Sequence, residues 1–123
     1  MRKFKFGWHG DQGLGEAIIQ SILLGKKTAS CGPAYDPVDS DVQEGEELLL
    51  IDKNSTGRGV VRITRIEIRA CSQLDDAVAE KCGTTLDELK KKLAFANSRE
   101  IRGDEEMRII HFQLISSKPP VER

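Results

Sequence analysis

The sequence predicts a small α+β domain whose sheet, mixed or antiparallel, closes into a barrel. Its 123 residues suit one domain with its own core, which we place at residues 1–117, followed by a flexible C-terminal tail at 118–123. The patterns run strand, helix, several strands, two short helices and a last strand, whereas a doubly wound sheet needs regular alternation. The strongest strand pattern, residues 59–69, also changes phase midway, and barrels commonly bend their strands this way.

The composition is that of a folded protein without a dominant charge. Hydrophobic residues make up 38% and charged residues 32%, which separates the chain from disordered sequences. Nineteen Lys and Arg residues against twenty Asp and Glu residues leave a net charge of −1. A strongly cationic coat for nucleic acid is therefore excluded, and any polyanion must bind to a local basic patch.

Nothing in the sequence calls for a membrane, an oxidising compartment or a metal. The apolar runs are only a few residues long, and no apolar stretch follows the first six residues, so we expect neither a membrane span nor a secretory signal. The sequence has an odd number of cysteines, Cys31, Cys71 and Cys82. Together with His9 and His111 they do not have the spacing of a zinc site. We expect a cytoplasmic protein without a metal or cofactor.

The first part of the chain predicts a strand, a helix and an extended segment. Residues 3–6 alternate charged and aromatic side chains, as a strand does. Apolar residues within 14–24 recur at the spacing of one helix face, and Gly25 suits the left-handed position that follows a helix. Residues 27–31 then form a short extended piece.

An acid-rich loop and a buried strand come next. Residues 32–43 are rich in turn formers, and acidic side chains occur from Asp36 to Glu47 with no Lys or Arg between them. Four successive apolar residues within 47–52 predict a buried strand, and residues 54–57 have the composition of a turn.

The longest strand pattern changes faces midway. Val61 and Ile63 share one face, but Ile66 and Ile68 share the opposite face, and a flat strand cannot bury both pairs on one side. A β-bulge near Thr64 would bring the two pairs together. A strand buried on both faces is the alternative, which we disfavour because the charged residues that follow Thr64 need solvent.

Two short helices and a closing strand complete the pattern. Apolar residues within 74–82 recur at helical spacing, and Gly83 ends that helix. Thr85 and Glu88 have the spacing of a capping box, which begins the second helix. Residues 107–115 alternate as a strand does.

Two cations and two hydroxyls gather in residues 25–31, directly after the first helix. In an extended conformation Lys27 and Cys31 lie on one side of the chain, while Thr28 and Ser30 lie on the other. Lys26 and Lys27 also stabilise the C-terminal end of the preceding helix. A structural role and a ligand-binding role for these cations are therefore both open.

This segment resembles the signature of the ASCH family in the run Leu-Leu-Gly-Lys-Lys-Thr-Ala-Ser at residues 23–30. Weaker similarities follow in order at residues 44–52, 60–66 and 79–86, so the resemblance covers nearly the whole chain. It implies a PUA-like barrel with one helix after the first strand and two short helices before the last.

The resemblance also implies a function, RNA or nucleotide binding in a cleft beside the barrel. The positions carried over as ligand contacts are Gly25, Lys26 and Thr28, and the cleft would hold no metal. Trp8, in the glycine-containing loop before the first helix, is a further candidate because an aromatic ring can stack on a base. Packing is the structural alternative for this single tryptophan.

Some small members of the family act as amidohydrolases on N4-acylated cytidines, and this is the alternative function. By resemblance the catalytic lysine is Lys27 and the hydroxyl is Ser30, with the lysine taking the proton of the hydroxyl. The family's carboxylate falls on Cys82 when the alignment has no gap. Glu80, two residues earlier, is the candidate for the catalytic acid, which requires the local helix to be shifted or to end early. Helical spacing places Cys82 in the apolar stripe and directs Glu80 away from it.

Overall fold

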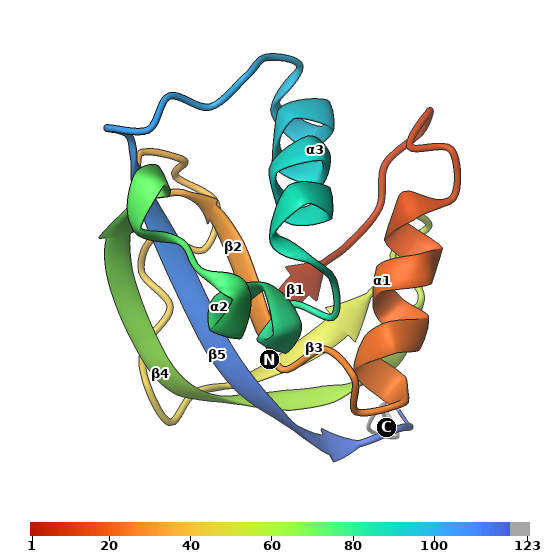
Figure 1. Cartoon of the computed structure of the whole chain (residues 1–123). Coiled ribbons are helices and arrows are strands. Elements are labelled where there is room, and N and C mark those ends of the chain that lie inside the picture. The colour runs from red at the N-terminus through yellow and green to blue at the C-terminus, as the bar shows by residue number, and fades with distance from the viewer. Residues whose placement is uncertain (119–123) are drawn as a thin grey trace.

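The computed structural model describes residues 1–118, so residues 119–123, most of the predicted tail, lie outside the described residues. The described residues form five strands, three α-helices and one short 3₁₀-helix, and Figure 1 shows how the strands and α-helices are arranged. In chain order they are β1 (Arg2–Lys5), α1 (Leu14–Leu23), β2 (Ala29–Pro33), β3 (Glu47–Ile51), β4 (Gly57–Ala70), η1 (Cys71–Gln73), α2 (Asp76–Lys81), α3 (Leu86–Asn97) and β5 (Glu106–Ser116).

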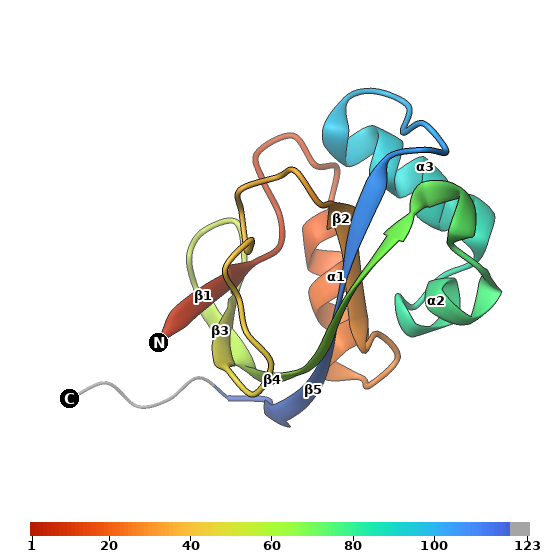
Figure 2. The ribbon, with the colours of Figure 1, turned by 90° about the vertical axis from the view of Figure 1, so that its left-hand side faces the viewer.

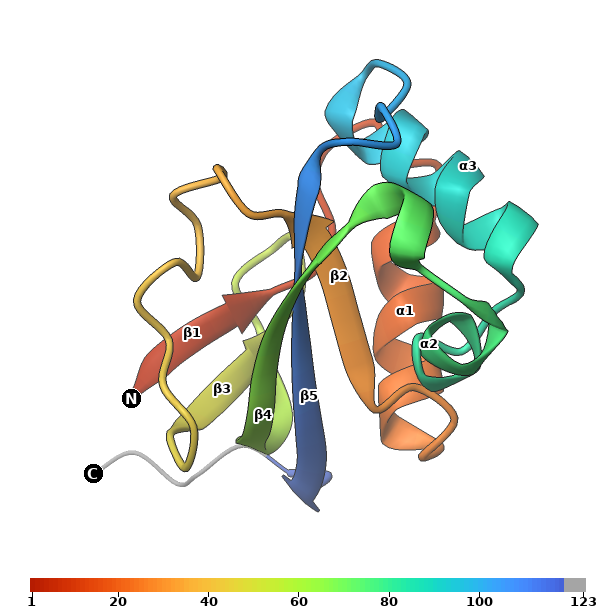
Figure 3. The same cartoon turned by 60° about the vertical axis from the view of Figure 1, so that its left-hand side comes forward.

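The strands form one mixed sheet in the order β1-β3-β4-β5-β2, which confirms the α+β class. Only the β1 and β3 pair is parallel, and the other neighbours are antiparallel. The sheet curls into a half-barrel, with β1 and β2 at its two edges. Figures 2 and 3 show α2 and α3 on one side of β5, with β1 and β3 on the other side. Helix α1 contributes Ile19 and Ile22 to the same apolar cluster as β1 and β3.

The predicted β-bulge is present at Thr64. In the pairing of β4 with β5, Ile63 lies opposite Phe112 and Arg65 lies opposite His111, so Thr64 is the extra residue. Because of this shift, Ile66 packs against the same apolar cluster as Ile63. Ile68, which we expected beside Ile66, is instead exposed.

Strand β5 separates two apolar cores. Ile110 and Phe112 belong to the barrel core, together with Phe4, Ile19 and residues of β3 and β4. On the other face, Met107 and Ile109 pack against α2 and α3. Both faces of β5 are therefore buried, and this holds the helical layer to the barrel.

His111 has a partner that the sequence did not indicate. It is buried, and its Nε2 lies 2.8 Å from Oε1 of Glu67. This hydrogen bond is the main cause of the lowered pKa of Glu67. The expectation that Glu67 needs solvent was wrong, because His111 and Arg69 contact its carboxylate.

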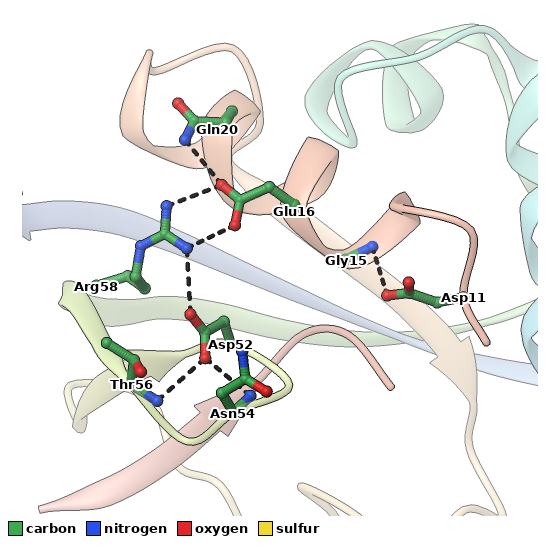
Figure 4. A network of polar contacts seen from close by, with 8 residues as sticks. All are labelled: Asp11, Gly15, Glu16, Gln20, Asp52, Asn54, Thr56 and Arg58. Carbon is green, nitrogen blue, oxygen red and sulfur yellow. Dashed lines mark hydrogen bonds and ion pairs between the residues drawn. The ribbon is translucent and has the colours of Figure 1, made fainter. Parts of the chain in front are cut away.

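Polar contacts fix α1 against the turn between β3 and β4 (Figure 4). Arg58 donates two hydrogen bonds to Glu16, at 2.6 and 2.8 Å, and a third to Asp52 at 3.3 Å. The hydrogen bonds from the Arg58 guanidinium lower the pKa of Glu16 to about 2. Asp52 in turn accepts hydrogen bonds from the main-chain N–H groups of Asn54 and Thr56, which closes the turn.

Candidate ligand-binding site

A cavity of about 340 Å³ lies where the N-terminal segment, α1, β2 and α3 meet. Eight of its sixteen lining residues have apolar side chains: Phe6, Trp8, Leu14, Ile18, Val38, Leu89, Leu93 and Ala96. Its polar groups include Lys27, Ser30 and Thr84. Apolar walls with a few converging polar groups are typical of small-molecule sites, and this volume is in their usual range.

Lys27 is the buried cation of this cavity. Helix α1 ends at Leu23, and Gly25 follows it with a φ of 77°. The main-chain N–H groups of Lys26 and Lys27 both donate to the carbonyl of Ser21. This turn directs Lys27 inward, where only 8% of it is exposed. The described structure gives its ammonium one hydrogen bond, to the carbonyl of Cys82 at 3.3 Å, and no carboxylate partner. Burial lowers the pKa of Lys27.

Gly83 lets the end of α2 pack against Lys27. Its φ is 80°, and a Cβ atom here would lie 2.8 Å from Oγ of Ser21 and 3.3 Å from Cβ of Lys27. A side chain at this position would therefore clash with the Ser21 hydroxyl and crowd the lysine stem.

Two thiols share the cavity with Lys27. Cys31 and Cys82 are both free, and Cys82 belongs to the apolar core, as its spacing predicted. Burial raises the pKa of Cys31 to about 12 and also raises that of Cys82. Both are therefore protonated at neutral pH, whereas a cysteine nucleophile requires the thiolate.

Trp8 lies at the mouth of the cavity and is 38% exposed. Its ring centroid is 5.7 Å from that of Phe95, with an interplanar angle of 39°. The loop that carries it is held by the carboxylate of Asp11, which accepts hydrogen bonds from the N–H groups of Trp8, Gly13 and Gly15. An aromatic ring carried on an anchored loop therefore lines the cavity.

The electrostatic character of the cavity is positive. Lys5, Lys27 and Lys92 line it, and none of its sixteen lining residues carries a carboxylate. The acid-rich loop between β2 and β3 contributes only Val38. Arg2 holds two of the loop's acids, Asp41 and Glu46, so their charges are paired elsewhere.

The structure brings together three of the residues that the sequence singled out, Lys27, Ser30 and Trp8. Gly25, Lys26 and Thr28 do not line the cavity, although the main chain of Thr28 joins α2 to β5 through hydrogen bonds to Lys81 and Phe112. Glu80 is exposed on α2 and is also absent from the lining.

Lys92 is a residue of this cavity that the sequence analysis did not single out. This lysine is half-buried and lines the cavity. A signal was present, because Lys92 follows Leu89 by three residues and precedes Ala96 by four, and such positions share a helix face.

A second, larger cavity of about 410 Å³ lies between η1, α3 and the segment before β5. Cys71, Leu93 and Ile101 line it, and its charged lining residues are Lys90, Lys91 and Glu100. All three of these charged residues are exposed, so this cavity has no counterpart of the buried Lys27. We therefore take the Lys27 cavity as the candidate site.

Across residues 1–118, no helix has the length and apolar character needed to cross a membrane. In the same region, no group of three or more His, Cys, Asp or Glu side chains is arranged to hold a metal ion.

Solved structures share this fold. Protein EF3133 from Enterococcus faecalis V583, of the DUF984 family, matches with a TM-score of 0.74 at 17% identity, over 100% of this chain and 86% of that chain. The ASCH domain from Lactobacillus crispatus JV V101 matches with a TM-score of 0.73 at 18% identity, over 93% and 80%. No protein-family model and no curated protein matches the sequence. The chain therefore has the fold of an ASCH domain.

Proposed function

We propose that this chain binds a nucleoside or nucleotide, free or at an unpaired position of RNA, in the Lys27 cavity. The observation that carries the proposal is a buried ammonium, without an acidic partner, in a cavity of ligand size. Burying an unpaired cation costs folding free energy, and such costs are concentrated at functional sites. A ligand with carbonyl or phosphate oxygens would supply the missing acceptors.

The walls suit the flat, apolar faces of a base. Leu89 and Leu93 line one side of the cavity, and the ring of Trp8 is available at the mouth for stacking. The ammonium groups of Lys5 and Lys92 could contact a phosphate. The fold similarity to an ASCH domain agrees with this ligand class, although it is the cavity that supports the choice.

The ligand is small, because the cationic surface is local. The net charge of the chain is −1, and only three lysines line the cavity. Any affinity for an oligonucleotide should therefore fall only slightly with added salt, since few phosphate contacts release few counterions. A salt slope that corresponds to six or more contacts would contradict this small site.

The single tryptophan makes the proposal testable by fluorescence. Trp8 lies at the cavity mouth, so its emission should change in a saturable way when the four nucleosides, their 5′-monophosphates or a short single-stranded RNA are added. We expect at least one nucleoside or nucleotide to bind. If none of them changes the emission at millimolar concentration, the proposal is wrong.

One observation favours a second function, hydrolysis of N4-acylated cytidine. Lys27 and Ser30 line the same cavity, and the lowered pKa of Lys27 suits a general base for a hydroxyl nucleophile. The lining has no carboxylate to pass the proton to the leaving amine, and Cys82 lies there while Glu80 does not. Binding without turnover is therefore the first proposal.

Turnover of N4-acetylcytidine by the purified chain separates the two functions. A hydrolase should release acetate, and the Ser30→Ala variant should lose this activity. The Glu80→Ala variant should lose it only if that exposed acid takes part. Binding of cytidine without release of acetate is the result that we expect. Acetate release that depends on Ser30 would make hydrolysis the function.

A further inference from the structure

The free edge of β2 directs main-chain groups away from the sheet. Phe112 donates its N–H to the carbonyl of Thr28, and Ala34 donates its N–H to the carbonyl of Glu106, both at 2.9 Å. Hydrogen-bonded pairs alternate along an antiparallel ladder, so residues 30 and 32 also bond to β5. The N–H and C=O groups of Cys31, between them, therefore point to the opposite side.

Pro33 provides an independent check on this alternation. It lies two residues after Cys31 and, by the same alternation, directs its main-chain nitrogen to the free edge. Proline has no N–H to donate, so within sheets it is found at positions that face away from a partner strand. No strand of the described chain pairs with β2 on this side.

The cavity runs along this free edge. Neighbouring side chains in a strand point to opposite faces, yet both Ser30 and Cys31 line the cavity. A space that touches both must follow the edge between the two faces. Within residues 1–118 the main chain of Cys31 has no hydrogen-bond partner on that side.

We propose that the main chain of Cys31 binds the polar edge of the ligand's ring. Its N–H donates to an acceptor on that edge, and its C=O accepts a hydrogen bond from the neighbouring donor of the same ring. This rests on the proposed function and specifies how it is carried out. Cyclic amides and amidines have such an edge, which in uracil is O4 with N3–H and in cytosine is N3 with the N4 amino group. Lys27 donates only, so it would bind a further ring carbonyl or a phosphate.

A nucleobase fits this edge better than a peptide does. An extended peptide could pair with an unpaired strand, but it needs an open edge several residues long. Here Leu89 and Leu93 of α3 wall one side of the cavity and Val38 lies at another, within about 340 Å³. A flat ring fills such a space, whereas a strand continues beyond it.

The test removes one hydrogen bond from each partner. On the ligand, 3-methyluridine lacks the N3–H of uridine and N4,N4-dimethylcytidine lacks the amino hydrogens of cytidine, while the 5-methyl analogues keep the polar edge. On the protein, Cys31→Pro removes the main-chain N–H at a position where β5 does not need it. The reference is Cys31→Ala, which also lacks the thiol but keeps the N–H.

We expect methylation of the ring edge to weaken binding by about tenfold, and the 5-methyl analogue to bind like its parent. Relative to Cys31→Ala, Cys31→Pro should bind the parent nucleoside about tenfold more weakly. Methylation of the ring edge should also reduce the affinity of Cys31→Pro by a smaller factor than it reduces that of Cys31→Ala. Equal affinities of the two variants, with nucleoside binding intact, would overturn this inference and leave the proposed function standing. Failure of every nucleoside to bind the wild-type chain would overturn both.

Proton exchange at the Cys31 amide gives a second measurement that needs no variant. When the parent nucleoside is bound, the NMR signal of the Cys31 amide proton should move downfield, and the exchange of this proton with solvent should slow. An unchanged Cys31 amide in the saturated complex would overturn the inference even if Cys31→Pro fails to fold.

Discussion

The Lys27→Met variant should be more stable than the wild-type chain and should lose ligand binding. Methionine fills the volume of the lysine stem but brings no charge into a site that is 92% shielded from solvent, since Lys27 is 8% exposed. Removing the cost of desolvation should raise the free energy of unfolding by about 1–3 kcal/mol. Binding should weaken by about 30- to 100-fold, the effect of losing a hydrogen bond from a charged group.

Thermal unfolding and the Trp8 fluorescence titration check both parts. Lys90→Met is the matched control, because Lys90 is an exposed lysine of α3 that does not line this cavity. It should change stability by no more than about 0.5 kcal/mol and leave binding as it is. A Lys27→Met variant that is less stable and still binds would show that the lysine supports the fold.

The same lysine gives stability a defined dependence on pH. Its pKa is lowered in the folded chain from an ordinary value of 10.5, so between the two values the unfolded chain binds more protons than the folded chain. The free energy of unfolding should therefore rise with pH across that window. In Lys27→Met this contribution should disappear.

The Gly15→Ala variant should be strongly destabilised. Gly15 begins the packing of α1 against the N-terminal segment, and a Cβ atom there would lie 2.2 Å from Cα and 2.7 Å from the nitrogen of Gly7. Both contacts are with main-chain atoms, which cannot rotate away. We expect a loss of about 3 kcal/mol or more, because α1 and the loop before it must separate.

Chemical denaturation measures this loss, and Gly32→Ala is the control. Gly32 lies in β2 with no atom within 4 Å of the added Cβ and no positive φ, so its substitution should have little effect. Gly15→Ala should also expose Trp8 and shift its emission to longer wavelength, since Gly7 and Asp11 hold that loop. Equal stability of the two variants would contradict the close approach of α1 to Gly7.

Local patterns predicted the elements of this fold because each pattern depends on neighbouring residues. The phase change between Ile63 and Ile66 predicted the bulge at Thr64, since strict alternation would place the two residues on opposite faces of a regular strand. Local patterns carry no information on strand order, however. The parallel pairing of β1 with β3 and the edge position of β2 therefore came only from the structure.

The same limit applies to the candidate site. Lys27 and Ser30 were found through the resemblance of one continuous segment, and they do line one cavity. Lys92 lies 65 residues further along the chain than Lys27, and no local pattern connects the two. The free edge at Cys31 could not be predicted at all, because it depends on which strands pair.

Residue-by-residue NMR during titration with cytidine and uridine 5′-monophosphates is the decisive measurement for the Lys27 cavity. We predict that the largest shifts occur at residues that line it from three separate parts of the chain, namely residues 5–8, Lys27 with Ser30 and Cys31, and Cys82 with Thr84. Shifts confined to the second cavity, around Cys71 and Ile101, or spread over exposed lysines without saturation, would contradict binding at Lys27.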